Sequence, residues 1–510
     1  MFESILFPQN RGIPLQTQEP ECFRDLNLDQ VFAPILRENP NLAPWIYTLC
    51  PDRETVFFRQ AVLKDLRREE NRQLFGDFSR ELLELSRLYR AAAEELSSGD
   101  SWRNTWLVRG HMLELGNRYC STLETLREKL RSRVLVSRGL ENFKIRLEAY
   151  CESPAYGQLS GALDKLNNRF GSLQYCLLIR NGTVRVKKYQ GEPDLSEEIL
   201  RVFERFRQGE GKDYRQQLPE RPYADHVEVG ILHCLSKLYP EEFDLLENFI
   251  RDFPDFLEEG ICRVAGELLF YLSWLKRTEP MEQAGLPFCI PGVAEPGERR
   301  FADGFFDLAL ADNLGSRIVA NDFFLEPPEQ IIVVTGPNQG GKTTFARAFG
   351  QLHYLAALGL TVPGRQAALG LSDRVVTHFE RQETIQSLSG KLQDDLIRLK
   401  ALLDQTTDRT VFVINEIFAS TTQADALELG GRMMELLLKT GAAGILVTFL
   451  EELARTGPET VSMMSSVEPE NPDCRTYRVV RRPPDGQAYA MTLARKHGLT
   501  YEMLRRRIQK

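Results

Sequence analysis

The sequence predicts a mainly α-helical region over residues 1–280, a linker over residues 281–304 and an α/β domain over residues 305–510. Three observations support this division. Before residue 280, apolar residues recur three and four positions apart, which is the spacing of one helix face. A segment rich in Pro and Gly follows. Beyond it, short runs of β-branched residues alternate with helical patterns, as in a parallel sheet covered by helices.

Length and composition limit the class of protein. A chain of 510 residues is too long for one hydrophobic core, so several domains are expected. Its 42% hydrophobic and 27% charged residues are typical of soluble globular proteins. The net charge of −8 confines any nucleic-acid contact to local basic patches.

The cysteines and the apolar runs indicate the compartment. Nine cysteines without a C-x-x-C pair argue against a zinc site or a disulfide framework and fit the reducing cytoplasm, where we expect the protein. No apolar run approaches the roughly 20 residues that a membrane helix needs. The first residues lack the basic stretch of a secretion signal. We therefore expect no membrane contact.

Two long helices are predicted to form an antiparallel hairpin. Each carries one apolar stripe, and residues 97–100 break the pattern between them. The pair is either a lever arm or part of a helical bundle, and the sequence favours neither. The stripes consist of Phe78, Leu82, Leu85, Tyr89, Ala92 and Leu96 in the first helix, and Met112, Leu115, Tyr119, Leu123, Leu126 and Leu130 in the second. Further helices are predicted over residues 28–37, from 52, and over 195–207, 227–239, 241–253 and 256–275.

A β-hairpin is predicted over residues 173–189, because Asn181-Gly182 separates two runs rich in β-forming residues. Arg185 and Lys187 share one face of the second strand. This face either contacts a phosphate backbone or is simply solvated, and the solvated interpretation is favoured.

Residues 331–344 carry the clearest signal of chemistry. Ile331 to Val334 predict a short buried strand. Gly336 to Thr343 then fit G-x-x-x-x-G-K-[ST], the phosphate-binding loop. Gly336, Gly340 and Gly341 allow the backbone to curl so that its N–H groups point at an anion.

The residues that follow the glycines supply the rest of a nucleotide site. Lys342 places a positive charge on the β- and γ-phosphates, and the hydroxyl of Thr343 is a ligand for Mg²⁺. From Thr344 a helix is predicted, with its positive end toward the phosphates. The predicted ligands are therefore ATP and Mg²⁺.

A second buried strand, over residues 410–416, supplies polar residues for the same site. ATPases with this loop place an Asp at the metal, and a following Glu polarises the attacking water. Here Glu416 is present, but Asn415 stands where the Asp is expected. The amide oxygen of Asn415 can accept a hydrogen bond from a Mg²⁺-bound water but adds no charge, so we predict weakened metal binding and slow hydrolysis. Further strands are predicted over residues 444–448, 475–481 and 489–492.

The loop and the sequence that follows it resemble the MutS family of DNA mismatch-repair ATPases. Residues 336–344, with Pro337 and Asn338, are similar to the G-P-N-M-G-G-K-S-T loop of that family. Further similarity covers most of residues 305–505 and is weaker over 20–275. It includes Val362-Pro363, residues 369–377, Ser389-Gly390, residues 415–425, residues 448–453 and residues 488–499.

The resemblance implies an ABC-type P-loop ATPase domain preceded by a helical core and lever region. It also implies DNA binding and a homodimer formed through the ATPase domains. Asn338, like Pro337 and Thr344, would then lie at the nucleotide of its own subunit. Ser389 would approach the nucleotide of the other subunit.

Several positions depart from the family pattern. Asn415 replaces the metal-side Asp, and Phe449 replaces a histidine near the γ-phosphate. Ile318 stands where an aromatic residue commonly packs on the base. No mismatch-reading or connector domain is found before the core, and no nuclease tail is found after the ATPase domain. The resemblance thus implies a DNA-binding protein related to mismatch repair or recombination, without establishing mismatch reading.

Three hypotheses remain at this point. The first is a MutS-type ATPase in which nucleotide state moves the helical arms on DNA. The second is a nucleotide-gated scaffold on nucleic acid or ribosomes with little hydrolysis. The third is an unrelated ABC-type or chromosome-condensing ATPase, but the spacing from Lys342 to Glu416 leaves no room for the long coiled coil of the latter.

Overall fold

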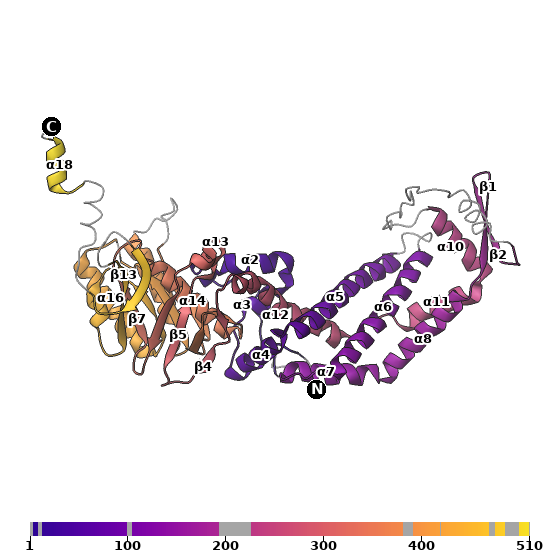
Figure 1. Cartoon of the computed structure of the whole chain (residues 1–510), viewed down its shortest axis with the longest axis horizontal. Helices are drawn as coiled ribbons and strands as arrows, with labels where there is room; N and C mark the ends of the chain where they lie inside the picture. Colours follow the sequence, from indigo (N-terminus) through magenta and orange to yellow (C-terminus); the bar gives the residue numbers. More distant parts are fainter. Residues whose placement is uncertain are drawn as a thin grey trace, which may run out of the picture.

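The computed structural model describes residues 4–8, 13–98, 105–192, 226–380, 391–418, 420–468, 475–484 and 499–508. The molecule is elongated, with an α/β body at one end and a helical arm that ends in a β-hairpin at the other (Figure 1). The predicted helix over residues 195–207, the strand over 489–492 and Ser389-Gly390 lie outside the described residues.

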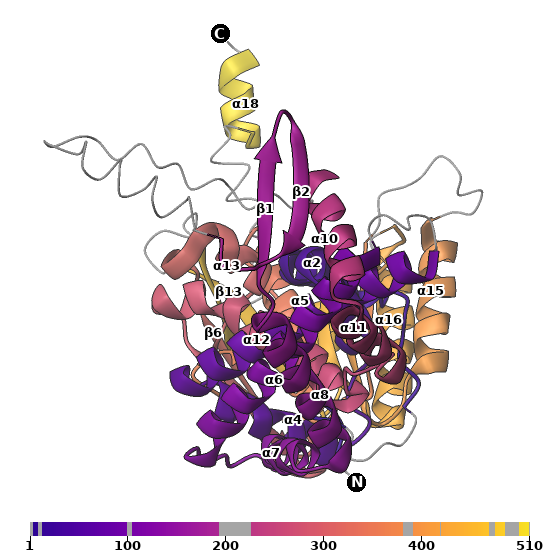
Figure 2. The same ribbon diagram turned by 90° about the vertical axis from the view of Figure 1, so that its right-hand side faces the viewer.

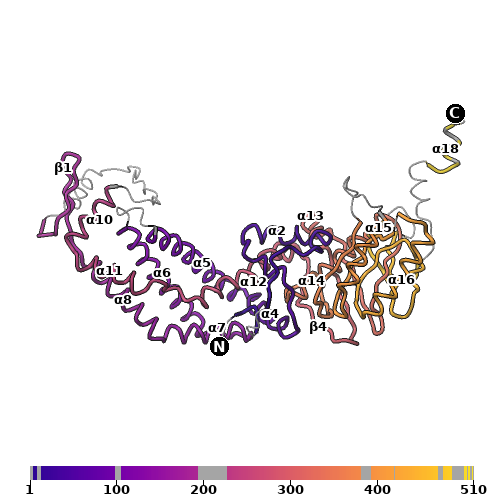
Figure 3. The backbone as a smooth tube through the Cα atoms, turned by 180° about the vertical axis from the view of Figure 1, so that it is seen from behind, coloured from indigo at the N-terminus to yellow at the C-terminus, as the bar shows by residue number. Residues whose placement is uncertain are grey.

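The arm is built around two long helices, α5 (Glu69–Ser98) and α6 (Thr105–Arg131), which pack side by side (Figure 3). Their predicted stripes are buried, as at Leu82 and Leu123. The helix hairpin is therefore confirmed. The other helices of this half are α1 (Cys22–Asp25), α2 (Leu28–Glu38), α3 (Ala43–Tyr47), α4 (Arg53–Leu66), α7 (Arg138–Cys151), α8 (Pro154–Gly171), α10 (His226–Leu238), α11 (Pro240–Asp252) and α12 (Glu259–Gln283), with a 3₁₀ turn at Pro40–Leu42.

The predicted β-hairpin is also confirmed. Strands β1 (Tyr175–Arg180) and β2 (Thr183–Lys188) pair antiparallel, with Arg180 opposite Thr183. Asn181 and Gly182 have φ angles of 51° and 73°, the left-handed conformation that a two-residue hairpin turn requires. The hairpin projects from the distal end of the arm (Figure 2).

The α/β body contains a six-stranded sheet in the order β10-β11-β12-β7-β13-β14. The first five strands are parallel to their neighbours, and β14 closes the edge antiparallel to β13. The strands are β10 (Arg374–Phe379), β11 (Thr410–Asn415), β12 (Ala443–Val447), β7 (Ile331–Thr335), β13 (Thr460–Val467) and β14 (Arg475–Arg481). The strands predicted near 331, 410, 444 and 475 are all present, whereas β13 was not predicted.

Helices cover this sheet: α14 (Lys342–Ala357), α15 (Lys391–Gln405) and α16 (Gln423–Thr440). The body also contains α13 (Leu308–Leu314) and 3₁₀ turns at Gly315–Arg317 and Glu451–Arg455. The chain ends in α18 (Tyr501–Ile508). Buried β-branched residues fill β7 and β11, as expected for parallel strands covered on both faces.

The linker prediction for residues 281–304 is wrong. Helix α12 continues to Gln283, and the segment then forms β3 (Phe288–Cys289), β4 (Gly292–Ala294) and most of β5 (Arg300–Phe305). These strands pair with β8 (Val362–Pro363), β9 (Gln366–Gly370) and β6 (Asn321–Leu325). Pro and Gly here interrupt short strands, so composition alone could not distinguish them from a linker.

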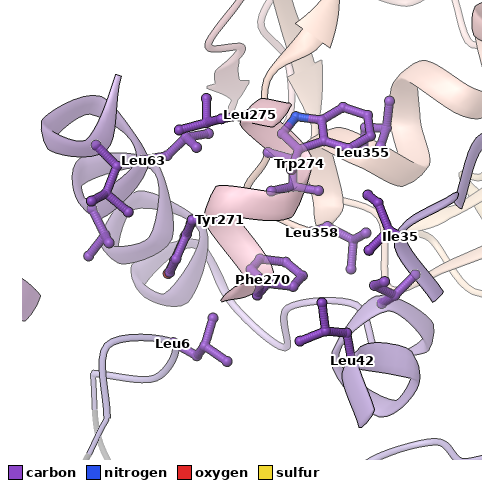
Figure 4. Close-up of a cluster of buried hydrophobic side chains, with 14 of the residues drawn as sticks. Leu6, Ile35, Leu42, Leu63, Phe270, Tyr271, Trp274, Leu275, Leu355 and Leu358 are labelled. Carbon is purple, nitrogen blue, oxygen red and sulfur yellow. The ribbon is translucent and has the colours of Figure 1, made fainter. Parts of the chain in front are cut away.

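One hydrophobic core continues from the N-terminal helices into the α/β body. Trp274 of α12 is buried and donates a hydrogen bond from its indole to Thr361 Oγ1 at 2.8 Å. Figure 4 shows Trp274 and Phe270 beside Leu355 and Leu358, at the end of α14. The N-terminal half therefore packs directly on α14, the helix that follows the predicted phosphate loop, and the domain boundary that we place between the halves stays a proposal.

The residues that the structure describes contain eight cysteines, and all eight are free thiols. No helix among these described residues is both long enough and apolar enough to cross a membrane.

Candidate nucleotide site

The predicted phosphate loop lies at the carboxyl ends of the parallel strands, between β7 and α14. Gly336 and Gly341 have φ angles of 111° and 88°, which L side chains rarely adopt. Gly341 is also the residue that caps the N-terminus of α14. This is the location where parallel α/β sheets bind ligands, and the helix N-terminus favours an anion there.

The side chain of Lys342 is buried inside the loop. Its Nζ donates to the carbonyl oxygens of Gly336 at 2.8 Å and Pro337 at 3.2 Å, and it lies 3.4 Å from Asn338 Oδ1. Burial lowers the pKa of Lys342, the nearby Glu416 carboxylate opposes this, and Arg475 adds to it. A buried ammonium held by neutral carbonyls is well placed to exchange them for a phosphate anion.

Asn415 and Thr343 meet at the ends of β11 and α14. Thr343 Oγ1 donates to Asn415 Oδ1 at 3.1 Å, and Asn415 is buried. The two predicted metal-side residues are therefore brought together by the fold. The pair is neutral, and Glu416, the residue directly after this strand, carries a carboxylate.

Glu416 turns the chain at the end of β11. Its φ of 55° is left-handed, an uncommon conformation for a residue with a side chain, and its N–H is held by Val447 O at 2.9 Å. Such strain persists where the surrounding structure fixes it, and it clusters at functional sites. The side chain of Glu416 lines the same pocket as Lys342 and Thr343.

A pocket of about 730 Å³ extends from the loop toward α13, which is a size typical of small-molecule sites. One end is polar and is formed by the loop. The other end is lined by apolar side chains together with Asp307 and Arg317, which flank α13. The lining residues at that end include Phe305, Leu310, Leu314, Ile318, Val319 and Ala348. A charged group and a flat apolar group joined in one ligand would match these two ends.

Phe449 follows β12 and covers the open side of Lys342. The ammonium lies 4.7 Å from the centroid of the Phe449 ring, within the range of a cation–π contact. The ring is 53% exposed, so it borders the site from the solvent side. An apolar ring here cannot donate a hydrogen bond to a phosphate or hold a water.

The structure brings the predicted site residues together, except for Ser389, which lies outside the described residues. Asn338, Gly340, Gly341, Lys342, Thr343, Thr344 and Glu416 line the pocket, Gly336 and Pro337 contribute the carbonyls that hold Lys342, and Asn415 binds Thr343.

Sequence reasoning missed the residues that β13 and β14 contribute. Ser465 lies under the loop, Arg475 Nε donates to Asn338 O at 3.3 Å, and Tyr477 lines the pocket. Tyr477 also has a left-handed φ of 59°. No local pattern marks these residues, because their role depends on pairing between strands distant in the sequence.

The fold and the loop define a class: α/β proteins in which an inner parallel strand leads through a phosphate-loop motif into a helix. Residues 332–510 match the family model for MutS domain V. Over this part of its sequence, the chain is similar to the MutS family.

Two relatives show the same similarity. The chain is 31% identical to the endonuclease MutS2 of Thermus thermophilus over 193 residues, which are 37% of this chain and 25% of the relative. It is 25% identical to the DNA mismatch repair protein MutS of Oleidesulfovibrio alaskensis over 194 residues, which are 37% of this chain and 22% of the relative. The matches thus span about a quarter of the length of these relatives.

Proposed function

We propose that this chain is an ATP-binding and DNA-binding MutS-type protein in which ATP binding and slow hydrolysis drive rearrangement of a dimer and its helical arms. The single observation that carries the proposal is Lys342, which is buried in the loop at the mouth of the pocket with exchangeable carbonyl partners. The triphosphate would contact the loop amides and Lys342. The base would lie at the apolar end, beside Ile318.

Mg²⁺ fits the residues at the end of β11. Thr343 would be its ligand, and Asn415 would reach it through a water. When bound, the ion would supply positive charge that offsets the negative charge of the phosphates. Glu416 is the residue we assign to polarise the attacking water. The neutral Asn415 and the apolar Phe449 give less electrostatic help than a carboxylate and an imidazole would, so hydrolysis should be slow.

DNA binding is supported by the similarity to an endonuclease and to a DNA mismatch repair protein, and by the basic residues of the β1–β2 hairpin. Within the described part of the chain, Arg180 and Arg185 have no ion-pair partner, whereas Lys187 pairs with Glu192. In α18, Arg505 is exposed. Cations without partners can release counterions from a phosphate backbone. A role in DNA mismatch repair or recombination, in the cytoplasm, follows from the family as a proposal.

A homodimer through the α/β bodies completes the proposal. The resemblance assigns Ser389 to the nucleotide of the partner. The proposal therefore requires that ATP promotes pairing of two chains, which sedimentation of the purified protein with and without ATP would detect.

The second candidate is a nucleotide-gated binding module on nucleic acid or ribosomes with little or no ATPase activity. The specific observations that favour it are the neutral pair of Thr343 with Asn415 and the Phe449 ring on Lys342. Both place neutral groups where hydrolysis needs charge.

Steady-state ATP hydrolysis by the unsubstituted chain and by Glu416→Gln separates the two candidates. The first predicts slow hydrolysis that needs magnesium and is lost in Glu416→Gln while ATP still binds. If both proteins bind ATP and show the same background rate, the module without ATPase activity is the correct description.

A further inference from the structure

Ser465 of β13 lies directly beneath the phosphate loop. In parallel pairing, Met464 is opposite Thr335, so Ser465 follows β7 into the loop. A Cβ atom built on Gly336 would lie 2.6 Å from Ser465 Oγ, and one built on Gly340 would lie 2.7 Å from the same atom. Both glycines of the motif are therefore needed partly because this side chain occupies the space below them.

The hydroxyl of Ser465 is completely buried and has no hydrogen-bond partner among the residues that the structure describes. A buried polar group without a partner destabilises the folded state, because it loses its hydrogen bonds to water and gains none. Its neighbour on the same strand, Ser462, instead donates to Arg482 O at 2.8 Å. A small apolar side chain would fit under the loop without this loss of stability. The stability of the fold therefore does not explain a hydroxyl at this position.

The carbonyl of Pro337 faces the same space as this hydroxyl. A Cβ on Gly340 would lie 3.0 Å from Pro337 O as well as 2.7 Å from Ser465 Oγ. At present that carbonyl accepts from Lys342 Nζ at 3.2 Å. When a phosphate draws the ammonium away, the carbonyl loses its donor within a buried loop.

We propose that Ser465 is a positioning residue of the nucleotide site, and that its hydroxyl donates to the Pro337 carbonyl when Lys342 turns to a bound phosphate. The hydroxyl is a buried donor without an acceptor, and the displaced carbonyl becomes an acceptor without a donor. The exchange moves one hydrogen bond from Lys342 to Ser465, so the loop closes on the ligand without leaving a buried carbonyl unpaired. This inference rests on the proposed nucleotide function.

The test compares Ser465→Ala with Ser462→Ala, which removes a hydroxyl from the same strand. Calorimetric titration with Mg–ADP gives the affinity, and thermal unfolding without nucleotide gives the stability. For Ser465→Ala we expect roughly fivefold weaker ADP binding, which corresponds to one hydrogen bond, together with an unchanged or higher melting temperature. For Ser462→Ala we expect unchanged affinity and a slightly lower melting temperature.

The melting temperature of Ser465→Ala separates the two roles: it is unchanged or higher if the residue positions the loop, and lower if the residue is structural. If Ser465→Ala lowers both the affinity and the melting temperature, the residue is merely structural and the inference is wrong. If the unsubstituted chain binds ADP and Ser465→Ala binds it equally well, the inference fails while the nucleotide function stands. If the unsubstituted chain binds no nucleotide, the proposed function fails and the inference with it.

Discussion

At the scale of single residues, the proposed nucleotide site has an amide where ATPases with this loop place a carboxylate. Thr343 and Asn415 are joined by a 3.1 Å hydrogen bond, and an Asp in place of Asn415 would keep the same acceptor. The geometry of the site therefore does not explain an amide at this position. The difference is electrostatic, because an amide oxygen attracts Mg²⁺ less strongly than a carboxylate does.

Replacing Asn415 with Asp tests this directly. We expect Asn415→Asp to raise the rate of ATP hydrolysis on the order of tenfold, because the added charge holds the metal at the terminal phosphates. Without magnesium, the buried carboxylate should lower the melting temperature, and magnesium should restore it. An unchanged hydrolysis rate in a variant that still binds ATP would show that Asn415 does not limit catalysis.

A buried carboxyl outside the site should make the stability of the fold depend on pH. Glu267 of α12 is buried and accepts from Ile5 N at 2.7 Å and Ser4 Oγ at 2.8 Å. Burial raises the pKa of Glu267 from 4.5 to about 7, and these hydrogen bonds only partly oppose it. The folded state therefore holds the proton more tightly than the unfolded state, so this carboxyl favours folding most below pH 4.5.

Stability from Glu267 should fall as the pH rises from 4.5 to 7 and then stay level. Glu267→Gln keeps an acceptor but cannot ionise. Relative to the unsubstituted chain, its free energy of unfolding should therefore increase between pH 5 and pH 8, by up to about 3 kcal/mol. Urea denaturation at the two pH values measures this, and a difference that does not change with pH would refute the account.

At the scale of elements, strand β12 sets the distance between the phosphate loop and Asn415. It lies between β11, which carries Asn415, and β7, which leads into the loop. Gly444 of β12 has no room for a side chain, because a Cβ there would lie 2.4 Å from Phe412 O. The backbone of β11 cannot give way without moving Asn415.

Gly444→Ala should therefore destabilise the fold by roughly 3 kcal/mol, because the added methyl meets backbone and the Phe412 ring. The matched control is Gly431→Ala in α16, where an added Cβ meets nothing within 4 Å. That change should be neutral or stabilising, since Ala favours a helix. Chemical denaturation compares the two, and equal stabilities would contradict the packing described for β12.

Local patterns in the sequence were sufficient for most elements. The β-hairpin, the stripes of α5 and α6, and the strand before the loop depend on neighbours in the chain, and each was predicted. The strands within residues 281–304 were not predicted, because β4 and β5 are short and pair with β9, more than 60 residues further on. Ser465 was missed for the same reason, since only strand pairing places it under Gly336.

The predicted site was incomplete in a specific way. The loop motif and the end of β11 identify Lys342, Thr343 and Glu416, because each has a fixed place after a strand. The resemblance placed Phe449 near the γ-phosphate, but it did not predict that the ring would lie against the ammonium of Lys342. That contact depends on β12 lying beside β7, which is a property of sheet order.

At the scale of the whole molecule, the α/β body and the β1–β2 hairpin lie at opposite ends of one packed structure (Figure 1). In the shared core, Trp274 of α12 donates a hydrogen bond to Thr361. This core connects α14 to the helices of the arm. A change at the loop would therefore act on packed helices and not on a loose linker. This arrangement suits the proposed coupling between nucleotide and arm.

The hairpin is the part of the arm that we expect to touch DNA. Reversing the charge of Arg180 and Arg185 should weaken binding to duplex DNA and reduce the slope of log affinity against log salt by roughly two, one for each lost phosphate contact. Arg374→Glu with Arg432→Glu, on the α/β body, makes the same change in net charge elsewhere and serves as the control. If both double variants lose affinity equally, the effect is one of net charge and the hairpin makes no specific contact.

The central claim is that the loop from Gly336 to Thr343 holds a triphosphate through Lys342. The most direct measurement is calorimetric titration of Mg–ATP into the unsubstituted chain and into Lys342→Met, which keeps the length of the side chain beneath Phe449 and removes its charge. The account predicts saturable binding of one ATP per chain and its loss in Lys342→Met, with both proteins folded by thermal unfolding. No binding to the unsubstituted chain, or equal binding to both proteins, would contradict it.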